Sequence, residues 1–510
     1  MTDKNLVSEK SDYDMEMNLL VRSLRKDPGD FTKEDIISFV RDEGIEIVNF
    51  CYSGADGRIK KLNFPVKNYR YLDLILEAGE RADGSSLFPY IDAASSDVYV
   101  VPRYSSAFLD PFSAVPSLNL MCSYIDNSGK PLNIGPYSIV KRVSQRIKED
   151  TGITLKALGE LEYYAIMDVE DDGFPSVPQQ NYHESAPFVK GEAMREEILT
   201  TLSRCGINVK YAHSEVGDLP PKGTKVAEQH EIELLPEPIE EMADHITIAK
   251  WVIRNIAAQM GVTVTFAPKI EVGHAGSGLH IHLCGEKDGR GIMVGEDGEL
   301  TSTARQMIGG TLQYAQSITA FGNTIPTSFL RLVPHQEAPT KVCWGPRNRS
   351  VLVRIPLGWG QDVANIGQVV NYGSVREPVA IPEKQTFEIR SPDLSSNPYH
   401  LLSALGAAIH WGLTNPEEAL KVADELYVTE NIFKDRKLAD RYRDLPGSCV
   451  ESAACLARER SVYEGIGFPA ELIDSMIEQL TAFNDENIRE EIVIDPEKLE
   501  EYVEKYFHCG

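Results

Sequence analysis

Short stretches of this chain alternate between apolar and polar residues, and that pattern predicts strands. These stretches are rich in Val, Ile, Leu, Tyr and Phe, which fit the pleated and half-buried surface of a sheet. Strands are predicted in this way at residues 45–51, 97–102 and 157–167. Because successive side chains point to opposite faces of a strand, one face can join a core while the other carries polar groups.

Other stretches repeat their apolar residues at the spacing of an amphipathic helix. A capping box from Thr32 to Asp35 opens one predicted helix. Further helices are predicted at residues 15–24, 137–149 and over most of the chain after residue 417. Strands and helices are mixed along the sequence without an internal repeat, so the predicted fold class is α+β.

The pattern changes near residue 134, and this divides the chain into three parts. Residues 1–31 are polar and form a predicted N-terminal extension, residues 32–134 a small domain, and residues 135–510 a larger domain. Two segments with Gly, Pro and Asn, 171–183 and 357–381, are long enough to be functional loops.

The composition argues against several classes of function. With 51 Lys and Arg against 77 Asp and Glu, the 510-residue chain has a formal charge of −26, which disfavours nucleic acid and anionic membranes as partners. The chain starts without an apolar signal segment and has no apolar stretch of about eighteen residues, so neither export nor membrane anchoring is predicted. The eight cysteines are scattered without a C-x-x-C pair, which fits a cytoplasmic protein.

Pairs of ionisable residues lie two positions apart within strand-forming stretches. Glu160 and Glu162 share one face of a strand, as do His280 and His282, while the residue inside each pair faces a core. A solvated strand face would also explain the glutamates, and ordinary core histidines the second pair. Apolar residues continue the strand after Glu162 and favour burial, and buried carboxylates are tolerated when cations neutralise them.

A divalent metal is the natural cation for such a cluster. Oxygen-rich sites with one imidazole suit Mg²⁺ or Mn²⁺ better than zinc, which prefers thiolates and histidines. Four arginines near these stretches offer fork-shaped donors for phosphate or carboxylate, although each alone could be a surface residue. They are Arg331, Arg349, Arg354 and Arg390. Together with the carboxylates, they indicate phosphoryl chemistry over metal.

Two glycine-rich segments do not match the common phosphate-binding loops. Residues 273–278 lead into a strand instead of opening a helix, so they are a poor dinucleotide fingerprint. Residues 217–224 contain the Gly-Lys pair of a P-loop in reversed order. A nucleotide, if bound, is held in another way.

Read in order, several motifs resemble those of the glutamine synthetase family, from about residue 32 to the end of the chain. Asp83-Gly84-Ser85-Ser86 resembles a loop of its N-terminal domain, and Gly276-Ser277-Gly278-Leu279-His280 its glycine and histidine motif. The remaining matches are at residues 331–334, 337–339, 347–356 and 388–399. The resemblance implies a small N-terminal β-grasp-like domain and a large catalytic domain whose curved antiparallel sheet is flanked by helices.

The resemblance also implies the cofactors and their ligands. One metal ion is expected at Glu162, Glu215 and Glu231, and a second, which bridges the phosphates of a nucleotide, at Glu160, His280 and Glu388. ATP is the implied nucleotide substrate, with two or three Mg²⁺ or Mn²⁺ ions in each site. His282 and Lys384 are expected near the ATP.

Further roles implied by the resemblance concern the substrates. Arg331 and Arg390, helped by the backbone of Gly276, are expected to bind the carboxylates of glutamate. Arg349 and Arg354 are expected to steady the transferred phosphoryl group. The implied ammonium pocket consists of Asp83, Ser86, Tyr182 and Glu215. Glu337 matches the residue of a flap that closes over it.

The implied activity is that of an ATP-dependent ligase that forms glutamine from glutamate and ammonia. ATP converts the γ-carboxylate into γ-glutamyl phosphate, and metals and arginines spread the phosphoryl charge. Asp83 is expected to accept a proton from ammonium, and Glu337 to exclude water. The resemblance also implies a homo-oligomer, a dodecamer of two hexameric rings, in which Asp83 of one subunit completes its neighbour's site.

Three departures from the family pattern leave the acceptor open. Glu231 follows Glu215 by sixteen positions, a longer interval than usual, with residues 217–226 inserted between them. The loop at residues 357–381 is enlarged, and Ala275 stands where the family has asparagine. One alternative is therefore a γ-glutamyl-amine ligase that uses a small amine or polyamine. Another is a non-catalytic sensor, although such proteins are expected to lose metal ligands.

Overall fold

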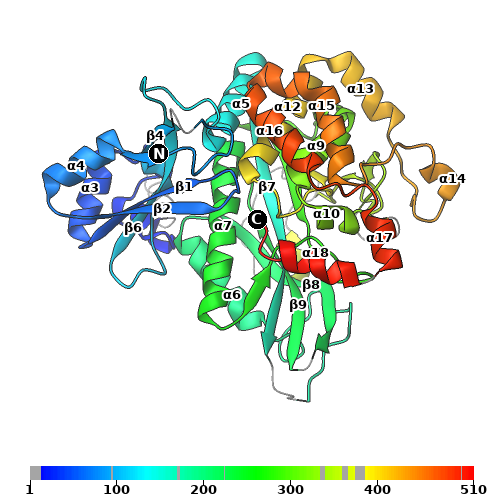
Figure 1. Ribbon diagram of the computed structural model, residues 1–510, viewed down its shortest axis with the longest axis horizontal. Coiled ribbons are helices and arrows are strands. Elements are labelled where there is room, and N and C mark those ends of the chain that lie inside the picture. Colours follow the sequence, from blue (N-terminus) through cyan, green and yellow to red (C-terminus); the bar gives the residue numbers. More distant parts are fainter. Residues whose placement is uncertain are drawn as a thin grey trace.

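The computed structural model describes residues 13–92, 96–168, 173–222, 224–333, 339–358, 366–373, 385–495 and 497–510. Figure 1 shows a small domain, drawn in blue, beside a larger domain formed by the rest of the chain. Each domain is built on one sheet, with six described strands in the first and ten in the second. Helices and antiparallel strands are mixed throughout, which agrees with the predicted α+β class.

The sheet of the small domain has the order β2-β1-β6-β4-β3, with β5 beside β6. Its strands are β1 (Ile47–Ser53), β2 (Ile59–Pro65), β3 (Glu80–Asp83), β4 (Asp97–Pro102), β5 (Phe108–Leu109) and β6 (Ser117–Ile125). Strands β1 and β6 are parallel, and the other pairs are antiparallel. The predicted strands at 45–51 and 97–102 are thus confirmed as β1 and β4.

Helices α3 (Lys33–Asp42) and α4 (Tyr69–Ala78) lie beside each other in this domain (Figure 1). The predicted capping box opens α3, because Thr32 and Asp35 exchange side-chain to backbone hydrogen bonds. Ile36, Phe39 and Leu76 line the inner faces of the two helices and join a core of their own. The short helix α2 (Leu19–Leu24), from the predicted extension, also packs there.

The large domain contains a sheet in the order β14-β15-β16-β12-β7-β9-β8. Its main strands are β7 (Thr154–Asp168), β8 (Val209–Lys222), β9 (Lys225–Leu234), β12 (Leu279–Lys287), β14 (Trp344–Pro346), β15 (Val353–Ile355) and β16 (Phe387–Ile389). Short strands β10 (Glu237–Pro238), β11 (Thr263–Thr265) and β13 (Arg290–Gly291) pair with β7 or β12. All pairs except β14 with β15 are antiparallel.

Helices surround this sheet, and one of them is central. Helix α12 is buried along nearly its whole length, because its residues are almost all small or apolar. The helices are α5 (Pro136–Thr151), α6 (Glu192–Arg204), α7 (Ile239–Gln259), α8 (Ser302–Gln313), α9 (Ala315–Gly322), α10 (Pro326–Arg331), α11 (Ile366–Val370), α12 (Pro398–Thr414), α13 (Pro416–Glu425), α14 (Arg436–Ala439), α15 (Cys449–Ile466), α16 (Ala470–Thr481), α17 (Ile488–Ile494) and α18 (Glu497–Tyr506). None of the helices described is both long and apolar enough to cross a membrane.

Residues 217–226 were expected to form an inserted loop, but the described part of this segment is a hairpin. Strand β8 continues to Lys222 and β9 begins at Lys225, so the insertion lengthens two strands and projects at the bottom of Figure 1. The β8–β9 register is irregular between Ser214 and Asp218. The extension therefore begins directly after Glu215.

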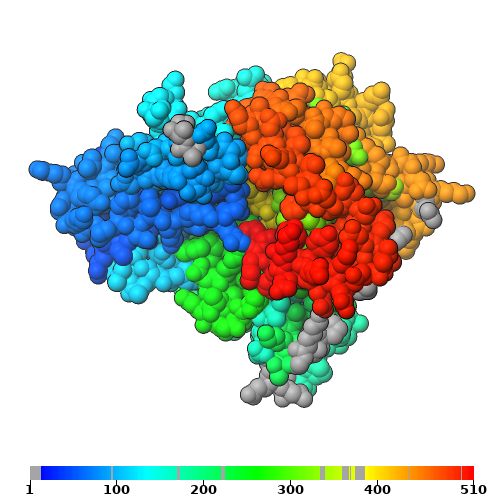
Figure 2. All heavy atoms as spheres, in the orientation of Figure 1, coloured from blue at the N-terminus to red at the C-terminus, as the bar shows by residue number. Residues whose placement is uncertain are grey.

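Several contacts join the domains. Arg103, which follows β4, donates two hydrogen bonds of 2.6 and 2.9 Å to the carboxylate of Asp244 in α7, and the hydroxyl of Tyr399 donates to the same carboxylate. The C-terminal segment, red in Figure 2, lies over the large domain and reaches the blue domain. There Arg58 of the small domain donates to the carbonyl of Gly510 at 3.2 Å.

Candidate active site

Strand β7 forms the centre of the candidate site. It carries Glu160 and Glu162, and its neighbours β12 and β9 both pair with it antiparallel. In this register His280 lies opposite Glu160, and Glu231 lies opposite Glu162. Residues directly opposite each other on antiparallel strands point to the same face, so three strands bring three carboxylates and an imidazole together.

Strands β16 and β15 extend the same face. Glu388 of β16 lies opposite His282 of β12, and Arg354 of β15 lies opposite Glu388. The side chains of His280, His282 and Glu388 are buried. The ionisable groups identified from strand alternation therefore meet in space, although they come from distant parts of the sequence.

Glu160 is held between two imidazoles. Its Oε1 lies 2.9 Å from Nε2 of His282, and its Oε2 lies 2.9 Å from Nδ1 of His280. Burial raises the pKa of Glu160, but the two histidines outweigh burial and bring the pKa well below its usual value. Glu160 therefore stays ionised, as a ligand for a cation must.

Glu388 is bound by two arginines. Nη1 of Arg354 donates to Oε2 at 2.8 Å, and Nε of Arg390 donates to Oε1 at 3.1 Å. Burial and the nearby Glu160 raise the pKa of Glu388, but His282 and Arg390 more than compensate and the net shift is downward. Glu388 thus links Arg354, which is expected to steady the phosphoryl group, to Arg390, which is expected to bind glutamate.

The pKa of Glu231 is shifted upward, in the opposite direction from the pKa values of Glu160 and Glu388. Burial, followed by the charges of Glu160, Glu162 and Glu215, raises its pKa well above the usual value. Oε1 of Glu231 lies 3.2 Å from Nε2 of His213. Carboxylates crowded in this way repel one another, and a divalent cation between them would relieve the repulsion.

Among the described residues, three groups of side chains offer ligand atoms that, within each group, all lie within 4.8 Å of one another. They are Glu160 with Glu231 and His280, Glu160 with His282 and Glu388, and His213 with Glu215 and Glu231. Each group has two carboxylates and one imidazole and contains no thiolate. This donor set fits a hard divalent ion such as Mg²⁺ or Mn²⁺.

The grouping differs in part from the sets predicted from sequence. Glu162 belongs to none of the three groups, but its Oε1 lies 3.7 Å from Nε2 of His280, while its Oε2 accepts the backbone N–H of Gly278 at 2.6 Å. His213 was missed, and it lies beside Glu215 and Glu231. The sequence does carry a signal for His213, because His213 and Glu215 lie two positions apart on β8, as Glu160 and Glu162 do on β7.

A group of rings borders this part of the site. The ring centroids of Tyr182 and His183 are 4.2 Å apart, and those of His183 and His213 are also 4.2 Å apart. The side chain of Tyr182 is 49% exposed and hydrogen-bonds Arg349. Tyr182, expected in the ammonium pocket, is thus linked to Arg349, which is expected to steady the phosphoryl group.

The glycine segment before β12 is tied down through its backbone. Gln229 of β9 donates to the carbonyl of Gly276 at 3.0 Å, and the hydroxyl of Tyr164 donates to the carbonyl of Ala275 at 2.8 Å. The side-chain oxygen of Gln179 accepts the N–H of Ala275, also at 2.8 Å. Gln229 and Gln179, which were not identified from the sequence, therefore fix the position of Gly276.

Arg331 and Arg390 are buried beside the cluster and already have protein partners. Arg331 donates to the backbone carbonyls of Ser391 at 2.9 Å and of Arg390 at 3.1 Å, and its Nη2 lies 3.3 Å from Nε2 of His280. Arg390 donates to the carbonyl of Arg349 at 2.5 Å. Part of the hydrogen-bonding capacity of both guanidiniums is thus used in holding the site together.

Asp83 and Ser86 lie in the small domain, at the end of β3. The hydroxyls of Ser86 and Ser85 donate to the two carboxylate oxygens of Asp83, each at 2.7 Å. These hydrogen bonds, that of Ser86 first, bring the pKa of Asp83 far below its usual value. Asp83 therefore keeps its negative charge as the pH falls, as a residue that attracts a cation must. Glu337 and Lys384 lie outside the described residues.

Comparisons with known proteins give a consistent result. The family model described as "Glutamine synthetase, beta-Grasp domain" matches residues 44–127, and "Glutamine synthetase, catalytic domain" matches residues 133–366. The chain is 28% identical to a glutamine synthetase of Staphylococcus epidermidis over 447 residues, which are 86% of this chain and 91% of the relative.

Two solved structures share the fold. A Plasmodium falciparum glutamine synthetase matches with a TM-score of 0.72 and 20% identity, over 92% of this chain and 97% of that chain. A protein named GmaS, solved without ligand, matches with a TM-score of 0.71 and 19% identity, over 89% of this chain and 96% of that one. With the domain models, these matches confirm the expected β-grasp-like and catalytic domains.

Proposed function

The chain belongs to the glutamine synthetase family, and we propose that it is the ATP-dependent ligase that joins glutamate to ammonia. One observation carries the proposal. Glu160, Glu231, His280, His282 and Glu388 converge on one face of the sheet. A family member that had lost catalysis would be free to lose these buried, mutually repelling groups.

Members of this family use ATP and divalent metal ions. The residues proposed to hold the ions lie on or beside the central strands, and His213 lies beside two of them. They are Glu160, Glu162, Glu215, Glu231, His280 and Glu388. A bound Mg²⁺ or Mn²⁺ ion would neutralise phosphate charge. Arg349 and Arg354 would stabilise the transferred phosphoryl group, and Lys384 and His282 are proposed near the nucleotide.

The reaction needs two steps because a carboxylate is a poor electrophile. An oxygen of the γ-carboxylate of glutamate first bonds to the terminal phosphorus of ATP as the bond to ADP breaks. Ammonia then adds to the carboxyl carbon of γ-glutamyl phosphate, and phosphate leaves. Arg331, Arg390 and the backbone of Gly276 would orient glutamate for both steps.

Ammonium becomes a nucleophile only after it has lost a proton, which Asp83 is proposed to accept. Tyr182 and Glu215 are proposed to line the ammonium pocket, with Asp83 and Ser86 supplied by a neighbouring subunit. Glu337 is proposed to close over the acyl phosphate and keep water away. The shared site requires a homo-oligomer, proposed as a dodecamer of two hexameric rings.

Two experiments test the shared site: recovery of activity in a mixture of inactive variants, and a mass measurement of the active unmodified protein. In a mixture of Asp83→Asn and Arg354→Ala chains, subunits that exchange should regain part of the activity that each variant lacks alone. A fully active monomer of the unmodified protein would contradict the shared site.

We also propose a cytoplasmic location, which is supported by the eight cysteines, all of them unpaired.

A second candidate is a γ-glutamyl-amine ligase with the same acyl phosphate but an amine other than ammonia. Three observations favour it. Identity to the glutamine synthetase of Staphylococcus epidermidis is only 28%, and GmaS, a γ-glutamylmethylamide synthetase, shares the fold equally well. Ala275 is smaller than the family's asparagine, and half of Tyr182 is exposed at the amine pocket.

One experiment separates the candidates. Phosphate release with ATP, glutamate and Mg²⁺ is followed while ammonium, methylamine, ethanolamine or putrescine is varied, and the product is identified by mass. Preference for ammonium, with glutamine as product, supports the first proposal. Preference for another amine supports the second candidate, the γ-glutamyl-amine ligase. If no amine gives phosphate release, both ligase proposals fail and the non-catalytic sensor is the remaining alternative. Tyr182→Ala should broaden amine use, and unchanged selectivity would contradict the pocket assignment.

A further inference from the structure

Gln179 lies in the loop that carries Tyr182, and its side-chain amide joins this loop to two other segments. Its Nε2 donates to the backbone carbonyl of Asp218 at 2.9 Å, and its Oε1 accepts the backbone N–H of Ala275 at 2.8 Å. Asp218 lies in the lengthened hairpin of β8 and β9, and Ala275 in the glycine segment before β12. One side chain thus connects two departures from the family pattern, residues 217–226 and Ala275, to the loop of Tyr182.

The backbone of Gln179 adopts a conformation that residues with a side chain rarely take. Its φ is +60°, in the left-handed region, and His183, on the other side of Tyr182, also has a φ of +60°. For a residue with a Cβ this conformation is unfavourable, so contacts within the folded protein must maintain it. At Gln179 the two hydrogen bonds of the side-chain amide supply such contacts. The loop is therefore held in a defined shape around Tyr182.

Further hydrogen bonds hold the loop against β8 on both sides of Tyr182. After it, the backbone N–H of His183 donates to the carbonyl of Ser214 at 3.0 Å. Before it, the hydroxyl of Ser176 donates to the buried carboxylate of Asp218 at 2.6 Å. The loop is therefore fixed to β8, and its glutamine amide reaches from there to the glycine segment.

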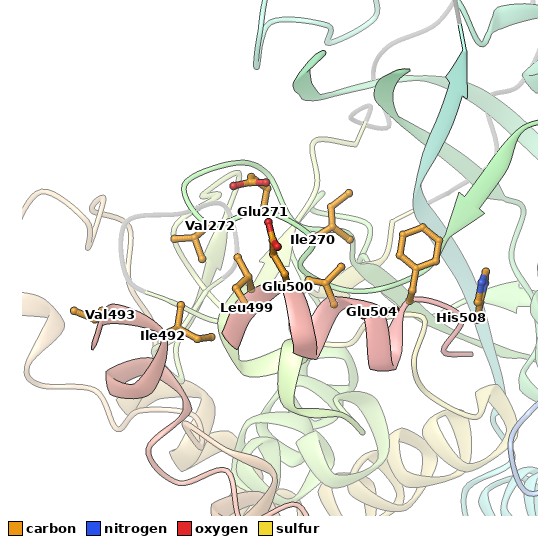
Figure 3. A pocket seen from close by; sticks show the side chains of 11 residues that line it. Ile270, Glu271, Val272, Ile492, Val493, Leu499, Glu500, Glu504 and His508 are labelled. Atoms are coloured by element: carbon orange, nitrogen blue, oxygen red, sulfur yellow. The ribbon is translucent and has the colours of Figure 1, made fainter. Parts of the chain in front are cut away.

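The glycine segment is open on its preceding side. A groove of about 940 Å³ lies between residues 270–272 and helix α18, as Figure 3 shows, and Val272 is 49% exposed. A Cβ added at Gly273 would meet no atom of the described residues within 4 Å, apart from its neighbours in the chain. Packing therefore constrains the start of this segment little. The place of Ala275 depends on hydrogen bonds, among them the one to Gln179.

We propose that Gln179 positions Tyr182 relative to Ala275 and thereby determines how strongly the site discriminates between ammonium and small alkylamines. This inference rests on the proposed ligase function, in which Tyr182 lines the amine pocket and Gly276, next to Ala275, orients glutamate. Gln179 acts through these residues and is not itself catalytic. Methylamine exceeds ammonia by one methyl group, and excluding so small a group requires walls held at a fixed spacing. Without the two hydrogen bonds of Gln179, the loop and the glycine segment could move apart and admit both amines.

The kinetic test compares Gln179→Met with the matched control Gln180→Met. Methionine has nearly the size of glutamine, but it has no N–H to donate and only a weak acceptor. Gln180 is exposed, and its side chain makes no hydrogen bond within the described part of the chain. The ratio of kcat/KM for ammonium to kcat/KM for methylamine should move about fivefold or more towards one in Gln179→Met, and it should stay constant in the control. KM for ATP should stay constant in both variants.

A second variant separates the side-chain contacts from the backbone conformation. Asparagine keeps an amide and tolerates a left-handed φ better than glutamine does, but it is one carbon shorter and cannot reach both partners. Gln179→Asn should therefore lose discrimination as Gln179→Met does. Hydrogen exchange of the full-length protein gives a readout that needs no turnover. Residues 173–183 and 273–278 should exchange about ten times faster in both Gln179 variants, and at the unmodified rate in Gln180→Met.

Three results would overturn the inference while leaving the proposed function intact. They are unchanged discrimination in Gln179→Met, full discrimination in Gln179→Asn, and an equal loss of discrimination in Gln180→Met. Unchanged exchange of the glycine segment in the Gln179 variants would also overturn it, since the hydrogen bond to Ala275 would then not hold that segment. Inactivity of the unmodified protein with every amine would defeat the proposed function, and this inference with it.

Discussion

Nε2 of His213 lies 3.2 Å from Oε1 of Glu231, on adjacent strands that sequence reasoning had linked only through Glu215. Burial lowers the pKa of His213, so its imidazole is neutral and has a lone pair to offer. The structure thus places an imidazole beside two carboxylates, Glu215 and Glu231, of one predicted set of metal ligands.

The first prediction concerns this imidazole. His213→Ala should weaken Mn²⁺ binding about tenfold or more, because both ligands and residues that position ligands typically contribute that much. The measurement is a Mn²⁺ titration followed by electron paramagnetic resonance. The control is His410→Ala, since His410 of α12 pairs with Asp150 of α5 and belongs to none of the three ligand groups. Equal affinity in both variants would exclude His213 from the site.

The second prediction compares the contributions of Glu160 and Glu162, both on β7, to metal binding. Glu160→Gln should abolish most Mn²⁺ binding, because Glu160 belongs to two of the three ligand groups. Glu162→Gln should have a smaller effect, since an amide oxygen can still accept the N–H of Gly278. The same titration compares them, and a larger loss for Glu162→Gln would restore the ligand set inferred from sequence.

A third prediction follows from crowding of the carboxylates. Mn²⁺ should stabilise the protein against heat, by about 2.7 kcal/mol at one hundred times its dissociation constant. Calorimetric melting with and without the ion measures this. Glu231→Gln removes one of the repelling charges, so its melting temperature should respond less to the ion. A melting temperature independent of the ion in the unmodified protein would contradict the metal cluster.

The fourth prediction concerns pH. The serine hydroxyls lower the pKa of Asp83, so its carboxylate stays charged as pH falls and loses its charge only through that low pKa. Ser86→Ala removes the largest cause of the shift and should move the acid limb of kcat/KM for ammonium to higher pH. Ser128→Ala serves as control, because the hydroxyl of Ser128 donates to Asp126 and not to Asp83. An identical profile for both variants would contradict this role.

The last prediction concerns the joint between the domains. Arg103→Met should destabilise the protein by about 3–5 kcal/mol, because it leaves the buried carboxylate of Asp244 without its cation. The double variant Arg103→Met with Asp244→Asn should recover part of the loss. Urea denaturation measures both, and equal stability of the two variants would show that the charges are not coupled.

The sequence by itself determined the elements and most of the candidate chemistry. Alternation predicted β1, β4 and β7, and the capping box fixed the start of α3, because these signals arise from contacts between near neighbours. The same alternation placed Glu160 beside Glu162 and His280 beside His282. The family resemblance then supplied the architecture, which the domain models confirm.

Only the tertiary structure decided which of these groups meet. The pairing of β7 with β9 and β12 set Glu231 against Glu162 and His280 against Glu160, and the hairpin of β8 and β9 brought His213 to Glu231. A strand's own sequence states which face a side chain takes, but not which strand will lie beside it or in what register. That choice depends on burying apolar surface across the whole domain.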